Sequence, residues 1–125
     1  MIAVDTSTLV AFLGGEEGGD VTAFMQALAR DQVCLPPVVV SELLSAPEAP
    51  RIERWIVNLP ILVVTDGFWQ RAGLLRRKIL ARRLAAPLAD TLIAQICIDH
   101  DVSLVTRDND FRRYVKHGGL VLGAV

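Results

Sequence analysis

The sequence predicts an α/β fold: a single domain, residues 1–125, built as a three-layer α/β/α sandwich around a mainly parallel sheet. Two observations predict it. Short apolar runs of strand length alternate with longer segments of helical periodicity, and Asp, Gly or Pro closes most of them. With 125 residues, of which 52% are hydrophobic, the chain is long enough for one core and too short for two.

The first elements are a strand, two helices and a second strand. "MIAV" is a short apolar run that ends at Asp5, and Gly14 with Gly15 stops the helical segment that follows it. "DVTAFMQALARD" starts with an Asp and carries its apolar residues on one helical face. "VCL" predicts the second strand. The expected strands are residues 1–4 and 33–35, and the expected helices are residues 6–13 and 20–31.

The segment "VVVSELLS" fits two structures. Pro37 can open a helix at its first position, which favours a helix over residues 37–45. The consecutive valines would equally suit a strand, because β-branched side chains fit a pleated surface.

The rest of the chain continues the alternation. The clearest helix is "DGFWQRAGLLRRKILARR", with apolar residues on one face, and "APLADTLIAQICIDH" is apolar nearly all round, as a central buried helix would be. Gly118 and Gly119 end the last helix. We expect helices at residues 50–59, 66–83, 86–100 and 109–117, and strands at residues 61–64, 103–106 and 120–122.

Composition excludes several classes of protein. A net charge of −1 gives no global basic field of the kind that marks many nucleic-acid binders. Cys34 and Cys97 lie far apart among apolar neighbours, which predicts buried free thiols in a reducing compartment. The start lacks the basic region of a signal peptide, and no uncharged stretch reaches the ~18 residues of a membrane span. We expect a cytoplasmic protein without a membrane segment.

Carboxylates follow two of the predicted strands. Asp5 comes directly after the first strand, and Asp108 and Asp110 come just after the strand at residues 103–106. The carboxyl ends of parallel strands form the ligand-binding edge of such a sheet, so we expect these acids to converge. Each could instead cap a helix. Ser7 could cap the helix after Asp5, however, and one helix start after residue 106 needs one cap and not two.

Two further acids stand alone in apolar helices. Asp90 is the only charge between Arg83 and Asp99, and Glu42 is the only charge between Asp31 and Glu48. Each has an ordinary explanation, since a first-turn Asp favours the helix dipole and a helical Glu is usually solvated.

One hypothesis covers all of these acids: a hard divalent cation. Carboxylates accompanied by the hydroxyls of Ser7 and Thr106, with no His or Cys close in sequence, suit Mg²⁺ or Mn²⁺ better than zinc. Such ions activate water and stabilise the charge of a phosphodiester displacement.

A basic run leads into Asp90. No acid lies between Asp66 and Asp90, and the run suits either a solvated helix face or a track for a phosphate backbone. Tyr114 is the open candidate for base stacking. The candidate RNA-binding residues are Arg76, Arg77, Lys78, Arg82, Arg83 and Arg107.

Four motifs in order, "MIAVDTSTLVAFL", "SELL", "ADTLIAQ" and "LVTRDNDF", resemble the PIN domain. More narrowly, the chain resembles the VapC-type toxin ribonucleases of bacterial and archaeal toxin–antitoxin pairs. The resemblance implies a Mg²⁺- or Mn²⁺-dependent endoribonuclease that cuts structured RNA such as tRNA or rRNA. It also implies a homodimer that is neutralised by a small VapB-type antitoxin. The alternative is a PIN-like module that binds RNA or protein without cutting.

The resemblance also implies the roles of the site residues. Ser7 and Thr106 would orient carboxylates or waters, and the last acid of the family pattern aligns with Asp108 or with Asp110. The acids that would hold the metal and perform catalysis are Asp5, Glu42, Asp90, Asp108 and Asp110.

Overall fold

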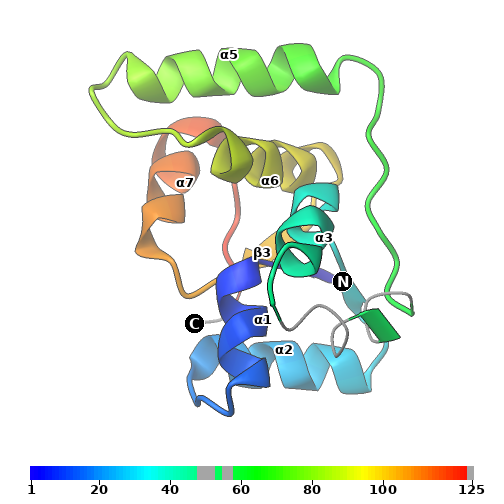
Figure 1. The fold of residues 1–125 in the computed structure, drawn as a ribbon. Helices are drawn as coiled ribbons and strands as arrows, with labels where there is room; N and C mark the ends of the chain where they lie inside the picture. The colour runs from blue at the N-terminus through cyan, green and yellow to red at the C-terminus, as the bar shows by residue number, and fades with distance from the viewer. Residues whose placement is uncertain (48–52, 55–57, 124–125) are drawn as a thin grey trace.

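The structure is a computed structural model that describes residues 1–47, 53–54 and 58–123 (Figure 1). The helix predicted at residues 50–59 falls largely outside these ranges. Cys34 and Cys97, which are both described, are buried free thiols as predicted. Among the described helices, none is long and apolar enough to cross a membrane.

A parallel sheet forms the centre of the molecule. Its strands are β1 (Ile2–Val4), β2 (Val33–Cys34) and β3 (Ser103–Val105), in the order β2-β1-β3. In the register, Ala3 lies opposite Cys34 on one side and opposite Leu104 on the other. The prediction of an α/β fold around a parallel sheet is confirmed.

The full strands predicted at residues 61–64 and 120–122 are wrong. Each segment contributes one isolated parallel bridge, Ile61 with Leu35 and Leu122 with Leu104. The first run is not covered by a helix of the described part of the chain: Val63 and Val64 are 67% and 44% exposed. An apolar run predicts a buried strand only where another layer is available to bury it.

The helices follow the predicted order. Pro37 is at the start of α3, so the segment that could have been a strand is a helix. The 3₁₀ turn η1 (Asn109–Phe111) leads into α7, which ends at Gly119 in the left-handed conformation with φ +87°. The helices are α1 (Thr6–Leu13), α2 (Gly19–Ala29), α3 (Pro37–Leu44), α5 (Phe68–Leu80), α6 (Leu88–Asp99) and α7 (Arg112–Gly118).

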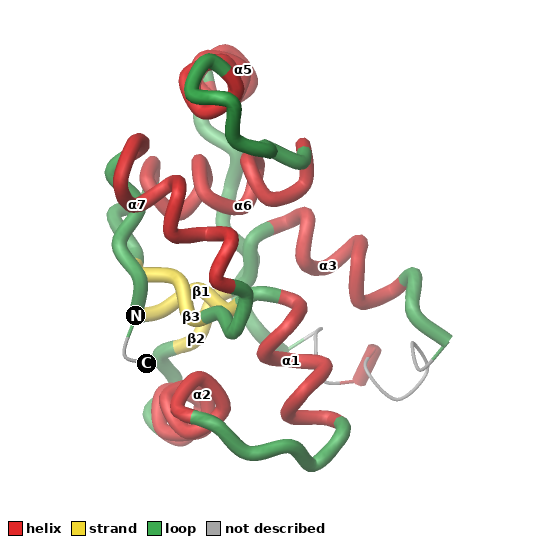
Figure 2. The backbone as a smooth tube through the Cα atoms, turned by 90° about the vertical axis from the view of Figure 1, so that its left-hand side faces the viewer, coloured by secondary structure: helices red, strands yellow, loops and turns green. Residues whose placement is uncertain are grey.

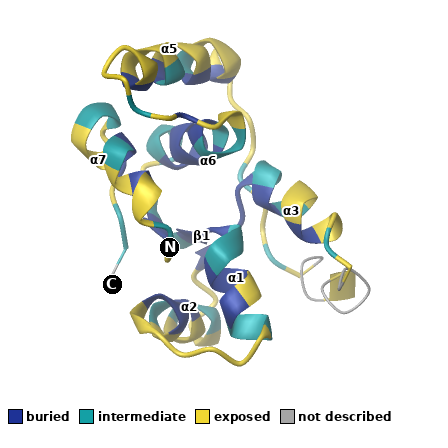
Figure 3. Ribbon diagram, turned by 60° about the vertical axis from the view of Figure 1, so that its left-hand side comes forward, coloured by how far each residue is buried: buried dark blue, intermediate teal, exposed yellow. Residues whose placement is uncertain are grey.

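Helices cover both faces of the sheet. Figure 2 shows α2 on one side, α6 on the other, and α5 beyond α6. Helix α6 is central, since half of its residues are buried and only Leu88 is exposed, as its nearly uniform apolar sequence predicts (Figure 3). Helix α5 buries only one stripe: Phe68, Ala72, Leu75 and Ile79.

The topology brings the residue that follows β1 next to the residues that follow β3. β1 and β3 are adjacent and parallel, so both end at the same edge of the sheet. The amide of Asp5 donates to the carbonyl of Val105 at 2.9 Å, which ties the residue after β1 to the last residue of β3. The side chains that follow these two strands therefore share one edge, which is where a ligand site is expected in such a fold.

Candidate metal centre

Asp5 is held by two hydroxyl groups. Its side chain is not used as a helix cap, although Asp5 is at the cap position of α1, and the residue is 5% exposed. Ser7 Oγ and Thr106 Oγ1 each donate to Asp5 Oδ2 at 2.8 Å, and these two hydroxyl oxygens are 3.2 Å apart. Ser7 lies inside α1, so the suggestion that it caps the helix is wrong. Both hydroxyls contact the carboxylate that the resemblance expected them to orient.

The two acids after β3 have different surroundings. The amide of Asp108 donates to Thr106 Oγ1 at 3.0 Å, and the Asp108 side chain caps η1 by accepting from the amide of Asp110 at 2.9 Å. The side chain of Asp110 is 63% exposed and pairs with Arg113 at 3.2 Å. Asp108 is therefore connected to Asp5 through the Thr106 hydroxyl, whereas Asp110 is exposed with its own counter-ion.

Asp90 lies in the first turn of α6 and is partly buried. Burial raises the pKa of its carboxyl to about 6, and repulsion by Asp5, Asp108, Glu42 and Asp110 adds to the increase, in that order. Asp90 makes no hydrogen bond or ion pair with the described residues. The other four predicted acids thus act on Asp90 through space, and their repulsion favours its protonated form.

Glu42 approaches the site from α3. It is exposed, and Thr6 Oγ1 donates to its Oε1 at 2.8 Å. Sequence reasoning missed Thr6. The signal available was its place between Asp5 and Ser7 in "DTS", a run in which every side chain has an oxygen.

The residues fit a divalent cation with an incomplete protein shell. Among the described residues, no three carboxylate, imidazole or thiol side chains already form a cluster that could hold a metal. Mg²⁺ commonly keeps several waters and takes only one or two carboxylates from the protein, so a closed cluster is not required. The donors present are all oxygens, and the mutual repulsion at Asp90 is what a cation would relieve.

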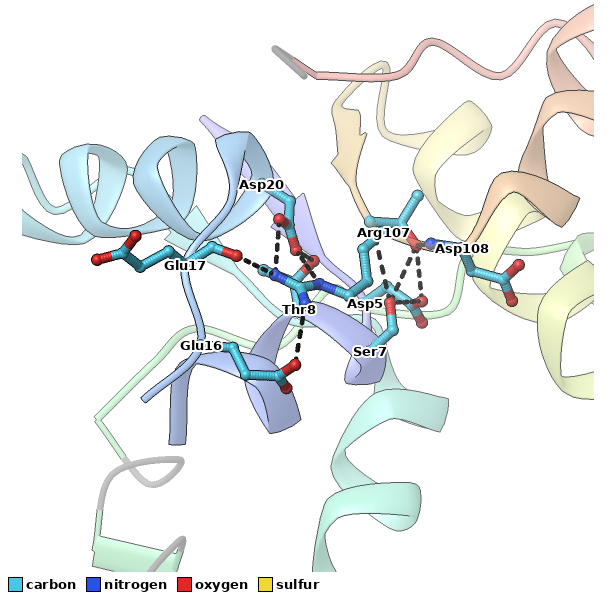
Figure 4. A network of polar contacts seen from close by, with 9 residues as sticks. Asp5, Ser7, Thr8, Glu16, Glu17, Asp20, Arg107 and Asp108 are labelled. Atoms are coloured by element: carbon cyan, nitrogen blue, oxygen red, sulfur yellow. Dashed lines mark hydrogen bonds and ion pairs between the residues drawn. The ribbon is translucent and has the colours of Figure 1, made fainter. Parts of the chain in front are cut away.

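Two of the predicted RNA-binding arginines have structural roles. Arg107 pairs with Asp20 at 2.9 Å and lies 3.6 Å from Glu16 (Figure 4). Arg76 donates from Nε to the carbonyl of Ala86 at 2.7 Å. These bonds give both arginines a structural role, and RNA binding by either one stays a prediction, because Arg76 uses only Nε here and the Arg107 side chain is 31% exposed. The remaining candidates are exposed: Arg77, Lys78, Arg82 and Arg83.

A basic cluster forms where α7 packs on α5. Partial desolvation lowers the pKa of His117, and repulsion by Arg82, Lys116 and Lys78 lowers it further. These three cations have no hydrogen-bond or ion-pair partner in the described part of the chain. We call these four residues the basic cluster.

Tyr114 cannot stack on a base, because it is fully buried. Its hydroxyl lies 2.9 Å from Thr91 Oγ1, so its role is to join α7 to the first turn of α6. Trp69, which lies in α5, is by contrast 63% exposed.

The structure is a small α/β protein in which four carboxylates repel a fifth, that of Asp90, near the carboxyl edge of a parallel sheet. We call Asp5, Glu42, Asp90, Asp108 and Asp110 the acidic cluster. The chain belongs to the PIN domain family: residues 2–116 match that family. No curated protein matched the sequence closely enough to count as a relative.

Solved structures share this fold at low identity. A chain of VapBC2 from Rickettsia felis, bound to a promoter DNA fragment, is 19% identical over 98% of both chains, with a TM-score of 0.77. A chain of FitAcB from Neisseria gonorrhoeae is 19% identical over 98% of this chain and 96% of that one, with a TM-score of 0.73. A chain of DNA-bound VapBC from Salmonella typhimurium is 18% identical over 98% of both chains, again with a TM-score of 0.73.

Proposed function

We propose that this protein is a Mg²⁺- or Mn²⁺-dependent endoribonuclease and the toxin of a toxin–antitoxin pair. The observation that carries the proposal is the surroundings of Asp90, whose pKa is raised by burial and by four other carboxylates at the sheet edge of a PIN domain. Carboxylates that repel one another in this way are costly in a protein that has no cation to bind.

The side chains have separate roles in this proposal. Asp5 and Asp90 would hold the ion, and Glu42 and Asp108 would complete its surroundings. Ser7 and Thr106 hold Asp5 in one orientation through their hydrogen bonds to Oδ2. When bound, a divalent ion in such a site activates water and stabilises the charge that develops on a phosphodiester. We expect products with 5′-phosphate and 3′-hydroxyl ends.

The basic cluster supports RNA as the substrate. Lys78, Arg82 and Lys116 form an exposed positive surface where α7 packs on α5, on a chain whose net charge is −1, and His117 lies among them. Unpaired cations bind a phosphate backbone without reading sequence, and their contribution falls as salt rises. We propose that structured RNA such as tRNA or rRNA lies across this surface while it is cut at the acids.

The partner proposal rests on the similar structures. VapBC2 from Rickettsia felis and VapBC from Salmonella typhimurium share the fold, and a third similar structure is described as a toxin–antitoxin complex from Klebsiella pneumoniae. We propose that a VapB-type antitoxin neutralises this protein, that the toxin is a homodimer, and that both proteins act in the cytoplasm.

The test is cleavage of a total tRNA pool by purified protein with Mg²⁺, with Mn²⁺ and with EDTA. Asp90→Asn is the test variant because it keeps the shape of the side chain and removes its charge. Asp101→Asn is the matched control, since Asp101 is an exposed carboxylate just beyond the other end of α6. We expect metal-dependent cutting by the wild type and the control, and none by Asp90→Asn.

Two results would overturn the proposal. Cleavage that continues in EDTA would show that the reaction needs no metal. Full activity of Asp90→Asn would show that the acidic cluster is not the active site. RNA binding without any cleavage, in folded protein that does not bind Mn²⁺, would favour the alternative of a non-catalytic PIN-like binding module.

A further inference from the structure

An ion pair with a nearly buried carboxylate, Asp20, and a partly exposed guanidinium, Arg107, lies next to the acidic cluster. The Arg107 guanidinium donates from Nε and Nη2 to the two carboxylate oxygens of Asp20, at 2.9 and 3.1 Å (Figure 4). Thr8 donates to Asp20 at 2.9 Å, and the carbonyl of Glu17 accepts from Arg107 Nη2 at 3.1 Å. Burial by itself would raise the pKa of Asp20, but the hydrogen bonds from Arg107 and Thr8 outweigh it and hold that pKa below its usual value.

The pair is connected to the candidate ligands through a short stretch of backbone. Arg107 lies between Thr106, which donates to Asp5, and Asp108. The amide of Arg107 itself donates to Ser7 Oγ at 3.3 Å. A displacement of the Arg107 side chain would therefore disturb the hydrogen bonds that fix two carboxylates of the site.

Packing alone does not hold this loop. A cavity of about 170 Å³ separates Thr106, Asp108 and Asn109 from residues of other elements, Gly19 and Leu122 among them, so the loop is not close-packed on that side. A loop that borders a cavity depends on its polar contacts for its position, because fewer dispersion contacts restrain it.

Gly18 has no side chain, and this leaves space for the ion pair between Arg107 and Asp20. A Cβ atom there would lie 2.9 Å from Arg107 Nη2 and 2.6 Å from Asp20 Oδ1, closer than side-chain carbons approach in proteins. Gly18 has φ +157° at the start of α2, and a larger residue would push against both members of the ion pair.

A second Arg–Asp pair has the same geometry at a different place. Arg71 donates from Nε and Nη2 to Asp99 at 2.9 and 2.7 Å, and the Asp99 side chain is 8% exposed, as is that of Asp20. Asp99 is at the far end of α6, nine residues from Asp90, which is about 13 Å along a helix.

We propose that Arg107 and Asp20 are positioning residues for the metal centre: their pair fixes the loop of residues 106–108 so that Asp5 and Asp108 face the ion. The role of the pair in metal binding rests on the function proposed above. Its role in fixing the loop does not. The positioning role replaces the role of Arg107 as an RNA contact. Partners of this kind change metal affinity by tenfold or more when they are removed.

The test compares Arg107→Met with Arg71→Met, since each removes one bidentate guanidinium and keeps a long apolar stem. For each variant we would measure the urea midpoint, hydrogen exchange of the amides of Asp108 and Asp110, and Mn²⁺ affinity by calorimetry without RNA. We expect both variants to lose stability. Only Arg107→Met should lose protection at these two amides and bind Mn²⁺ about tenfold more weakly.

Arg107→Lys separates positioning from simple charge, and it retains more of the pair should Arg107→Met fail to fold. A lysine keeps the positive charge but cannot make the bidentate contact. A positioning role predicts that Arg107→Lys still binds Mn²⁺ several-fold more weakly and that kcat falls with little change in KM. An RNA-contact role predicts normal Mn²⁺ affinity and near-normal activity.

The outcomes are distinguishable from failure of the proposed function. Protected amides and unchanged Mn²⁺ affinity in Arg107→Met would overturn the positioning pair, whatever the wild type does to RNA. Wild-type protein that binds no Mn²⁺ would overturn the metal site, while loss of amide protection in Arg107→Met would still support the fixing of the loop.

Discussion

The two halves of the acidic cluster are built differently. The half at the strand ends is connected by hydrogen bonds: Asp5 accepts from Ser7 and Thr106, and Thr106 also accepts from the amide of Asp108. The half on the helices is much less connected. Glu42 has a single bond, from Thr6, and Asp90 has no partner among the described residues.

This difference indicates which carboxylate a bound cation would stabilise most. The strand-end half is already ordered by neutral donors, which stabilise carboxylates without closing the site. Asp90 is pushed toward protonation by burial and by its neighbours, so its charge is the one that a divalent ion would stabilise most. Binding of the ion is then expected to draw Asp90 toward a strand-end half that barely moves.

The largest effect should come from substituting the two acids after β3 one at a time. Asp108→Asn keeps a side chain that can cap η1 but removes the charge beside Asp5, so we expect RNA cleavage to fall by about a hundredfold or more. Asp110→Asn should reduce it less than about threefold, because the Asp110 side chain is 63% exposed and pairs with Arg113. Single-turnover cleavage measures both.

Equal losses in these two variants would contradict the structural difference between the acids. A larger loss for Asp110→Asn would move the last ligand from Asp108 to Asp110, the other position that the family pattern allows. The urea midpoint of each variant is the control, since neither substitution removes a buried apolar contact.

Local patterns predicted much of this fold and its acids. "IAV" before Asp5, the apolar helix around Asp90 and the strand before Asp108 each carry a signal within a few residues, and β1 pairs with β3 as a parallel sheet requires. The arginine contacts carried no such signal. Arg107 and Asp20 are 87 residues apart, so nothing near either residue revealed that the guanidinium was occupied.

Side-chain burial was also beyond local patterns. Tyr114 is a plausible stacking residue by type, but its hydroxyl finds Thr91, 23 residues away, and this partner lets the ring enter the core. The run at residues 61–64 has strand composition, yet Ile61, Val63 and Val64 stay exposed, so no layer of the described residues covers them. Both differences come from tertiary contacts that override residue propensity.

Removing one hydroxyl from each half of the acidic cluster should have a smaller effect, and the two halves should differ. Thr106→Val removes the donor to Asp5 and the acceptor for the Asp108 amide, and it keeps the size and branching of the side chain. We expect Mn²⁺ affinity to fall about tenfold. Thr6→Val removes only the bond to Glu42, which is exposed, so its affinity should fall about twofold. Calorimetric titration in the absence of RNA measures both, and a larger loss in Thr6→Val would reverse the assignment of the ordered half.

The smallest effect is on the stability of the metal-free protein. The carboxyl of Asp90 has a pKa of about 6 in the folded state, against 3.8 as its ordinary value. Between these two pH values the folded state holds more protons than the unfolded state, so the free energy of unfolding falls as pH rises. Solvent screening at this partly exposed position limits the contribution to on the order of 1 kcal/mol.

Asp90→Asn should therefore stabilise the metal-free protein at pH 7 and flatten its dependence on pH between 4 and 6, as urea unfolding in EDTA would measure. Asp99→Asn is the control of opposite sign, because hydrogen bonds from Arg71 hold the pKa of Asp99 below its usual value and the substitution removes that stabilisation. If Asp90→Asn instead destabilised the metal-free protein, its charge would already be compensated in the fold. The contrast between an ordered strand-end half and a repelled helical half would then be lost, because both halves would be complete before any ion binds.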